Sequence, residues 1–437
     1  MSRTTPNFVS GEMTAQAVAP TPLSDVLPSV NPELELNYSL LHNNRPLFER
    51  FSIYKKTSEE GSVRITVELF QGEISMPFKA TVPLKKDEET IHFYDEHGKE
   101  TEALVIRLPL ASRMLRSLRE PVRSTMQVQI APSVGQAFLW EQTYFVTLLP
   151  VDQWRDTPDY WQLLPSFLQP RDPVIAKIIE QAQKYLMALS DDFSAGFDGY
   201  QSIVRVAPDE APNAAQAVGV DDAAPAAAEV ASGTPTETSA VVDTLDNLDC
   251  NGVDLQVRAI WAALLFDYQL FYINPPPEYR RDSQRIRRPT EVIEGCRGTC
   301  IDLAILLASC LEWIDVFPVV FLLKNHAFPG YWRSETLQKQ FVAEAAKITP
   351  NRRNPKEKEF KKWCFAEDPF YYLIRDAVAR GELVPLETID LTQRESFQTA
   401  LDHGLENLRS KFEFDAMIDI KTAREFKITP IPLAGEF

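Results

Sequence analysis

The chain has 437 residues and carries 45 Lys and Arg against 62 Asp and Glu, which gives a formal net charge of −17. This acidity makes the chain a poor candidate for general nucleic-acid binding and opposes adsorption to anionic membranes. Five cysteines are too sparse and odd a set for a disulfide framework, which favours a cytoplasmic protein. No apolar run is long enough to span a bilayer, so we expect neither a nucleic-acid nor a membrane partner.

The first part of the chain is predicted to be a tail followed by a β-domain. Residues 1–35 are rich in Pro, Ser and Thr, and we expect them to be disordered. After them, short runs tend to alternate apolar and polar residues, and several are separated by polar turns. These runs are 51–57, 62–70, 78–84, 102–110, 125–131 and 142–151. Their spacing predicts a β-sandwich of immunoglobulin-like type over residues 36–151.

The middle of the chain connects this β-domain to a second domain. Residues 152–206 are predicted to form an aromatic bridge and the first helix of the C-terminal domain, with Asp172 as its N-cap. Residues 207–243 contain no aromatics and only Ala and Val as apolar residues, so we expect a disordered Ala/Pro-rich linker. The C-terminal domain is placed at 244–437, and its first run, 252–273, predicts a strongly apolar helix.

The most informative run begins with Gly298, Thr299 and Cys300. It continues as CIDLAILLASCLEWI, which is apolar on almost every side and predicts a buried helix. Thr299 is the predicted N-cap, which places Cys300 in the first turn. There the unpaired backbone N–H groups and the helix dipole favour a thiolate over a thiol. Cys300 is therefore the candidate nucleophile, whereas Cys310 in the middle of the helix is predicted to be core.

A histidine and a carboxylate complete the candidate set. The run VFPVVFLL predicts a buried strand that ends at His326, which can lie beside Cys300 and exchange a proton with it. A third group must hold the imidazole in the useful tautomer. The strand-like run 381–392 carries Glu387 and Asp390 on opposite faces, so only one of these acids can be that group. The residues alone leave both open.

The run 273–332 resembles bacterial transglutaminase-like proteins of the papain-fold superfamily, of the type found alone or linked to superfamily 1 helicase domains. The Gly-Thr-Cys that opens a buried helix and the His-Ala that ends a strand carry most of the resemblance, which is specific over 250–333 and 381–433. It implies an α+β protein in which the β-sandwich precedes a papain/transglutaminase-like domain. In such a domain the buried Cys-bearing helix packs on an antiparallel sheet.

The resemblance also implies a triad in which Cys300 is the nucleophile, His326 the base and Glu387 the group that orients the base. Members of the superfamily usually have Asp where this chain has Glu387, so Asp390 stays a rival acid. They often have Gly before the histidine, where this chain has Asn325.

An oxyanion donor is needed as well. Gln201 is one candidate, by analogy with papain-like glutamines upstream of the nucleophile, and the backbone N–H of Cys300 is the other. We expect no cofactor and no metal, because Cys296, Cys300 and His326 lack the second ligand pair of a structural zinc site. Residues 333–380 are predicted to be a helical insertion that either caps the cleft or is only structural.

The expected activity is attack by Cys300 on an amide or related acyl bond of a protein or peptide, through a thioester. Resolution by water makes the protein a peptidase or amidase, and resolution by an amine makes it an acyl transferase. One alternative is a catalytically silent papain-like binding module. Another, suggested by the helicase-linked relatives, is an accessory subunit of a bacterial defence system that docks a protein partner through its N-terminal β-domain.

Overall fold

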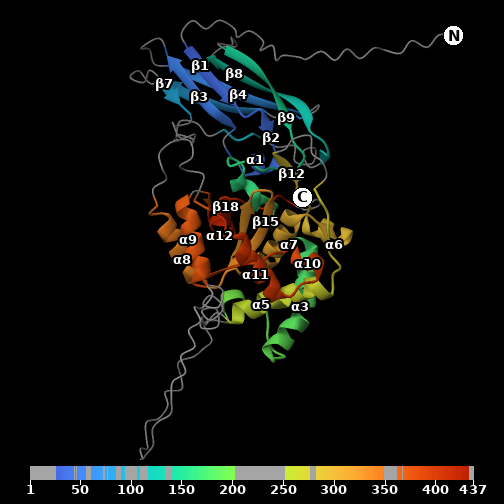
Figure 1. Ribbon diagram of the computed structural model, residues 1–437. Coiled ribbons are helices and arrows are strands. Elements are labelled where there is room, and N and C mark those ends of the chain that lie inside the picture. Colours follow the sequence, from blue (N-terminus) through green and yellow to red (C-terminus); the bar gives the residue numbers. More distant parts are fainter. Residues whose placement is uncertain are drawn as a thin grey trace, which may run out of the picture. The chain divides into compact units, whose positions relative to one another are not determined.

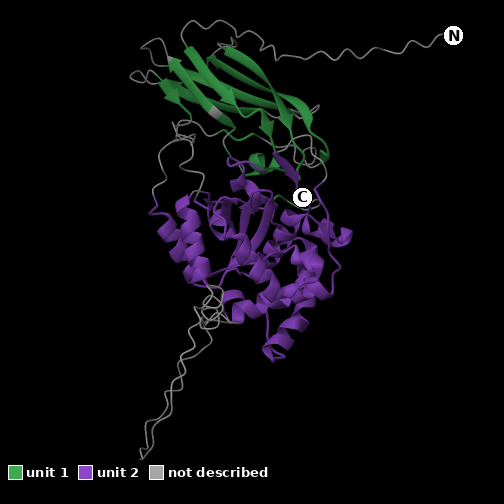
Figure 2. Ribbon diagram, in the orientation of Figure 1, with its two compact units in different colours: residues 1–155, 352–360, 431–437 green, residues 156–351, 361–430 purple. Residues whose placement is uncertain are grey.

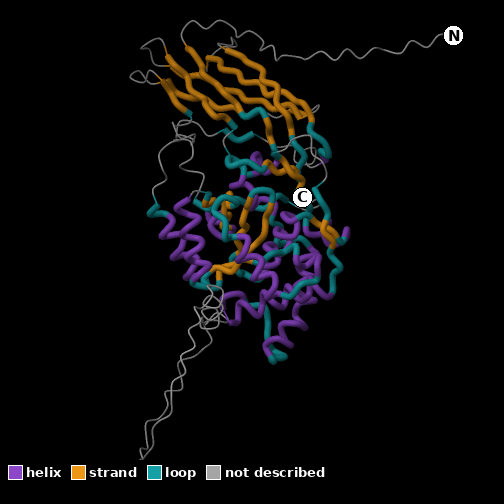
Figure 3. The backbone as a smooth tube through the Cα atoms, viewed as in Figure 1, coloured by secondary structure: helices purple, strands orange, loops and turns teal. Residues whose placement is uncertain are grey.

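The computed structural model of the protein describes residues 26–43, 45, 47–55, 61–71, 74–75, 77–84, 90–93, 106–108, 117–132, 140–201, 251–275, 282–348, 362–366 and 368–432. The protein is a mixed α+β structure that divides into two compact units, shown in separate colours in Figure 2. Unit 1 comprises residues 1–155 with two short later segments, and unit 2 comprises residues 156–351 and 361–430. Figure 3 shows the strands of unit 1 and the helices that surround the strands of unit 2.

The described part of unit 1 consists of strands and one short helix. They are β1 (Val26–Pro32), β2 (Glu35–Leu36), α1 (Tyr38–His42), β3 (Phe48–Lys55), β4 (Gly61–Gln71), β5 (Ile74–Ser75), β6 (Phe78–Leu84), β7 (Thr90–His92), β8 (Val122–Pro132), β9 (Trp140–Leu148) and β10 (Gln153–Arg155). One sheet has the order β1-β3-β7, and a second has the order β2-β9-β8-β4-β5 with β6 also paired to β4.

Alternating burial explains these strands. Along β4, Val63, Ile65 and Val67 are buried and the residues between them are partly exposed, which is the period of a strand with one covered face. The strand predictions at 51–57, 62–70, 78–84, 125–131 and 142–151 are confirmed by β3, β4, β6, β8 and β9. The predicted run 102–110 lies mostly outside the described residues, as do residues 1–25 and the predicted linker 207–243.

The prediction of a disordered tail up to residue 35 is wrong for its last ten residues. Val26–Pro32 forms β1, which pairs antiparallel with β3, and β2 follows it directly. The prolines Pro28 and Pro32 suggested a tail because proline cannot donate a ladder hydrogen bond. They are accommodated here because β1 is the first strand in the sheet order β1-β3-β7, and an edge strand tolerates proline.

Unit 2 alternates helices with short strands. They are η1 (Trp161–Phe167), α3 (Pro173–Ser190), α5 (Asn251–Phe266), β11 (Phe271–Tyr272), β12 (Ser283–Arg285), α6 (Pro289–Gly295), β13 (Arg297–Gly298), α7 (Cys300–Trp313), β14 (Pro318–Leu323), β15 (His326–Trp332), α8 (Glu335–Ala345), β16 (Cys364–Phe365), α9 (Asp368–Ala379), β17 (Leu383–Pro385), α10 (Asp390–Gln393), α11 (Phe397–Asn407), β18 (Phe414–Asp419) and α12 (Ile420–Glu425).

Two helix predictions in unit 2 have different outcomes. The helix after Asp172 is confirmed as α3, and the Asp172 carboxylate accepts a hydrogen bond from the N–H of Val174 at 3.1 Å, as an N-cap does. The helix predicted over 252–273 ends earlier, at Phe266. Two aromatic residues after it, Phe271 and Tyr272, instead form β11, which pairs in parallel with β13 just before Cys300.

The centre of unit 2 is an antiparallel sheet in the order β16-β18-β14-β15-β17. Helix α7 packs against β14 and β15, and every residue of this helix from Cys300 to Leu311 is buried. One apolar cluster joins residues of α3, α5 and α7, and another joins residues of β14, β15, α8 and α9. Figure 1 shows α7 on one side of β15 and α8 with α9 on the other.

The predicted insertion 333–380 therefore has a structural role in its described part. Phe341 of α8 and Ile374 of α9 are buried in the same apolar cluster as Phe321 and Phe328 of the sheet, so these two helices form the second covering layer. Of the two readings of this insertion, the packing supports the structural one. No helix among the described residues is both long and apolar enough to cross a membrane.

Candidate functional site

Cys300 is the first residue of α7, and the turn before it is held tightly. Thr299 is the N-cap: its side chain accepts a hydrogen bond from the N–H of Asp302, and Asp302 Oδ2 accepts one from the N–H of Thr299 at 2.9 Å. This reciprocal capping box fixes the start of the helix. Asp302 is fully buried and is neutralised by Arg287, whose Nη1 lies 2.7 Å from its carboxylate. The N-cap predicted at Thr299 is confirmed.

Gly298 explains why the motif begins with glycine. A Cβ atom added at this position would lie 3.1 Å from Asp302 Cβ and 3.2 Å from a methyl carbon of Leu303. A side chain there would push the strand away from the first turn of α7 and disturb the residues around Cys300.

His326 is the first residue of β15 and lies just past a two-residue turn after β14. In the hairpin register, Leu323 pairs with His326. The prediction that the histidine ends the preceding strand is therefore wrong, because β14 ends at Leu323 and the histidine begins β15 after the turn. Asn325 makes the turn possible with a φ of 63°. Glycine and asparagine are the residues that adopt this left-handed conformation most readily, which accounts for asparagine at a position where the resembling family often has glycine.

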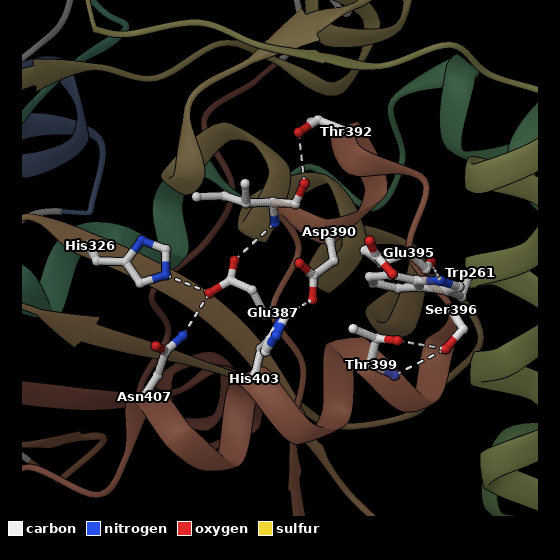
Figure 4. Close-up of polar contacts among 11 residues, drawn as sticks. Trp261, His326, Glu387, Asp390, Thr392, Glu395, Ser396, Thr399, His403 and Asn407 are labelled. Atoms are coloured by element: carbon white, nitrogen blue, oxygen red, sulfur yellow. Dashed lines mark hydrogen bonds and ion pairs between the residues drawn. The ribbon is translucent and has the colours of Figure 1, made fainter.

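The imidazole of His326 contacts Glu387 on one side and Cys300 on the other. His326 Nε2 lies 2.6 Å from Glu387 Oε2 (Figure 4). Because an ionised carboxylate only accepts, Nε2 carries the proton in this hydrogen bond. Nδ1 is then the ring nitrogen left to exchange a proton with the Cys300 side chain, which also hydrogen-bonds His326. The ring stacks on Phe328, with centroids 5.6 Å apart.

The charges around His326 favour its protonated form. Burial alone lowers the pKa of His326, but the hydrogen bonds and negative charges of Cys300 and Glu387 raise it to about 10. The imidazole is thus stabilised as an imidazolium, the form that the hydrogen bonds and charges on either side of it favour. This arrangement can hold a proton at neutral pH and give it to a leaving group.

Glu387 is itself fixed by three contacts besides the bond to His326. Its Oε1 accepts a hydrogen bond from the N–H of Ile389 at 2.9 Å, and its Oε2 accepts one from Asn407 Nδ2 at 2.7 Å (Figure 4). Its backbone N–H donates to Ala400 O. Its side chain is nearly fully buried. The orientation of this carboxylate is therefore determined by both the following turn and α11.

The rival acid, Asp390, does not reach His326. Its Oδ2 lies 2.9 Å from Nδ1 of His403, a residue of α11 (Figure 4). The strand predicted over 381–392 is wrong beyond Pro385, because β17 ends there and Asp390 begins the short helix α10. The two acids point to different histidines because a turn separates them, and not because they alternate along a strand.

Sequence reasoning missed three residues at the site. Asn407 and His403 lie four residues apart on α11, so they share one helix face and reach Glu387 and Asp390 respectively. That polar i, i+4 spacing in the run 397–407 was the available signal. Tyr272 was missed because it was assigned to a helix.

Tyr272 lies close to the cysteine and its partners. It pairs with Gly298, two residues before Cys300, and its side chain is exposed. Burial of part of its ring raises the pKa of Tyr272, and the charges of Cys300, Glu387 and Asp302 raise it further. The raised pKa keeps the Tyr272 hydroxyl in its neutral form, which can donate a hydrogen bond.

The oxyanion candidate Gln201 is not at this site. Tyr200, its neighbour, donates a hydrogen bond from its hydroxyl to Trp332 O and accepts one from the N–H of Phe317. Trp332 is the last residue of β15 and His326 is the first, so this contact lies about 20 Å along the strand from the histidine. Gln201 is therefore too far from His326 to be the oxyanion donor.

Cys296 also stands apart from Cys300. It is exposed and caps the end of α6 with a φ of 51°. Both are free thiols, Cys296 on the surface and Cys300 buried. The part of the chain that the structure describes contains no group of three or more His, Cys, Asp or Glu side chains arranged to hold a metal ion.

A scan of the chain against protein-family models finds no match, and neither does a search of curated proteins. The function of this site is therefore inferred from its own geometry. A cysteine lies at a helix start, a histidine contacts it, and a fixed carboxylate holds that histidine from the other side.

Proposed function

We propose that the protein is a cysteine acyl-transfer enzyme of the transglutaminase-like type, which acts on amide or related acyl bonds of a protein or peptide. One observation carries the proposal: the His326 ring contacts Cys300 and Glu387 at the same time. A nucleophile, a base and a group that orients the base are the minimum machinery for nucleophilic acyl substitution.

The residues suggest the following steps. The Cys300 thiolate attacks the carbonyl carbon, and a C–S bond forms. When the tetrahedral intermediate collapses, the bond to the leaving group breaks and the His326 imidazolium donates its proton to the departing amine. Water or a second amine then attacks the thioester and gives a proton to His326, and Cys300 leaves as the thiolate. Glu387 keeps its charge and holds the ring throughout.

The oxyanion of the intermediate requires hydrogen-bond donors. The backbone N–H of Cys300 lies in the first turn of α7, where N–H groups have no intrahelical partner. We assign the phenol of Tyr272 as the second donor, because β11 pairs this residue with Gly298, two residues before Cys300, and because the phenol is neutral there.

We also propose a fold type for each of the two units. A buried helix that starts with the cysteine and packs on an antiparallel sheet, with the histidine on that sheet, supports a papain/transglutaminase-like fold for unit 2. The two sheets of unit 1, with alternating burial along β4 and β8, support an immunoglobulin-like sandwich. A silent binding module has less support, because every group of the triad is present and in contact.

Acyl-enzyme formation tests the proposal without a known natural substrate. The protein is mixed with p-nitrophenyl acetate, p-nitrophenol release is followed, and the intact mass is measured during the burst. We expect one acetyl group on Cys300, absent from Cys300→Ala, and faster release when an amine such as glycinamide is added if the enzyme is a transferase. A wild-type protein that stays unacetylated at Cys300 would support the binding module.

A further inference from the structure

Behind the Cys300–His326–Glu387 site lies a second pair of residues, Asp390 and His403, that none of the proposed steps uses. Asp390 is almost completely buried, whereas the His403 side chain is 49% exposed, and His403 Nδ1 lies 2.9 Å from Asp390 Oδ2. A buried carboxylate needs a charged or hydrogen-bonding partner, and His403 is the one it has in the described structure. The pair therefore ties the start of α10 to α11.

This tie acts on the turn that carries Glu387. The turn is closed by hydrogen bonds from the N–H groups of Leu391 and Thr392 to the carbonyl oxygens of Thr388 and Ile389, at 3.2 and 2.8 Å. Asn407 of α11 holds Glu387, the first acid of the turn, and His403 of the same helix holds Asp390, the second (Figure 4). Two anchors on one helix face fix both ends of the turn.

Helix α11 itself has little freedom to shift. A Cβ atom added at Gly404, the residue after His403, would lie 2.7 Å from Pro385 O, so the helix packs directly on the backbone that leads to Glu387. The backbone hydrogen bond from Glu387 N–H to Ala400 O adds to this contact. A movement of the His403 end of α11 is therefore transmitted to Glu387.

The charges around the pair are consistent with a charged tie. The hydrogen bond to Asp390 raises the pKa of His403, as do the charges of Asp390, Glu387 and Glu406, against a lowering by burial. Burial raises the pKa of Asp390, His403 lowers it, and Glu387 and Glu395 raise it. A protonated His403 thus neutralises the second of two acids that would otherwise repel each other across the turn.

We propose that His403 and Asp390 are positioning residues for the acyl-transfer site, which hold the Glu387 turn so that its carboxylate stays directed at His326. The proposal rests on the proposed function of Cys300 and His326. The pair does not touch the reacting atoms; it acts through Glu387.

The test follows the rate of Cys300 alkylation by iodoacetamide against pH in the full chain, with peptide mass mapping. His403→Ala removes the tie, and His403→Asn keeps a donor at the position of Nδ1. The acid limb of this profile is the range in which the alkylation rate rises with pH. In His403→Ala we expect this limb to shift to higher pH by at least about half a pH unit, so that the alkylation rate at a given pH within the limb falls by about threefold. His403→Asn is expected to recover a large part of this loss.

Thermal unfolding of each variant separates positioning from simple support. A His403→Ala protein that is less stable but keeps the wild-type limb would overturn the positioning role, and so would a limb that moves equally in His403→Ala and His403→Asn. In both cases the wild-type limb still depends on His326, so the proposed function survives. If the wild-type limb is that of an ordinary thiol and ignores His326, the proposed function fails, and the positioning role falls with it.

Discussion

Nε2 of His326 and Oε2 of Glu387 lie 2.6 Å apart, although 61 residues separate them in the chain. The first belongs to β15, and the second follows β17, the neighbouring strand of the same sheet. The sheet order thus brings together a histidine and a carboxylate that the insertion of α8 and α9 keeps far apart in sequence.

Glu387→Gln tests this contact. The substitution keeps the size of the side chain but removes its charge, so the pKa of His326 should fall and the imidazolium should be lost at lower pH. We expect Cys300 alkylation at pH 6 to slow by about tenfold or more. Glu425→Gln, at an exposed position of α12, is the matched control and should behave as wild type. Equal rates in the two variants would remove Glu387 from the site.

Cys300→Ala tests the other contact of His326. The Cys300 side chain raises the pKa of the imidazole through a hydrogen bond and through its charge. Its removal should therefore lower the His326 pKa from about 10, measured by NMR titration of the histidine ring signals. Cys296→Ala, which removes an exposed thiol, should leave that titration unchanged. A His326 pKa that is the same in both variants would show that the two side chains do not interact.

Asn407→Ala should both destabilise the fold and slow the chemistry. The variant leaves a buried carboxylate oxygen of Glu387 without one of its donors, at an expected cost of about 1–3 kcal/mol in the free energy of unfolding. Urea unfolding provides the measurement. Gln398→Ala, which removes an exposed pair on the same helix, should change stability by less than about 0.5 kcal/mol. A loss of the same size in both would mean that Asn407 is an ordinary surface residue of α11.

Tyr272→Phe separates the oxyanion role from the Cys–His pair. Loss of one oxyanion donor typically costs about 10²–10³ in rate, so acetylation of Cys300 by p-nitrophenyl acetate should slow strongly. Alkylation by iodoacetamide forms no oxyanion and should keep its wild-type rate. Phe271→Leu, at the exposed neighbouring position, is the control for the local strand. If both reactions of Tyr272→Phe match wild type, the phenol is not a donor.

The sequence predicted those parts of the site that depend on local patterns. A continuous apolar run after Gly-Thr-Cys implies a buried helix with its cap at Thr299, and that helix is α7. The alternating runs of the N-terminal part imply strands, and these form as β3, β4, β6, β8 and β9. Periodicity and capping are decided within a few residues, so a sequence window contains the information.

Other parts of the site are decided by tertiary contacts. Tyr272 was assigned to a helix because the apolar run continues past Phe266, yet pairing with Gly298 makes a strand there. The residues alone could not rank Glu387 above Asp390, and only the resemblance favoured Glu387, because the end of β17 and the partners on α11 are set by packing against distant residues. Gln201 was placed by analogy alone, and the anchoring of its neighbour to the far end of β15 removes it from the site.

The central claim is that Cys300 and His326 form a reactive pair, and the pH dependence of Cys300 alkylation by iodoacetamide tests it most directly. Peptide mass mapping follows Cys300 and the exposed Cys296 in the same sample, so Cys296 serves as the internal reference. The account predicts fast alkylation of Cys300 at about pH 6 that is lost in His326→Ala. Slow alkylation of Cys300 with the profile of an ordinary thiol near ~8.5, unchanged in His326→Ala, would contradict it.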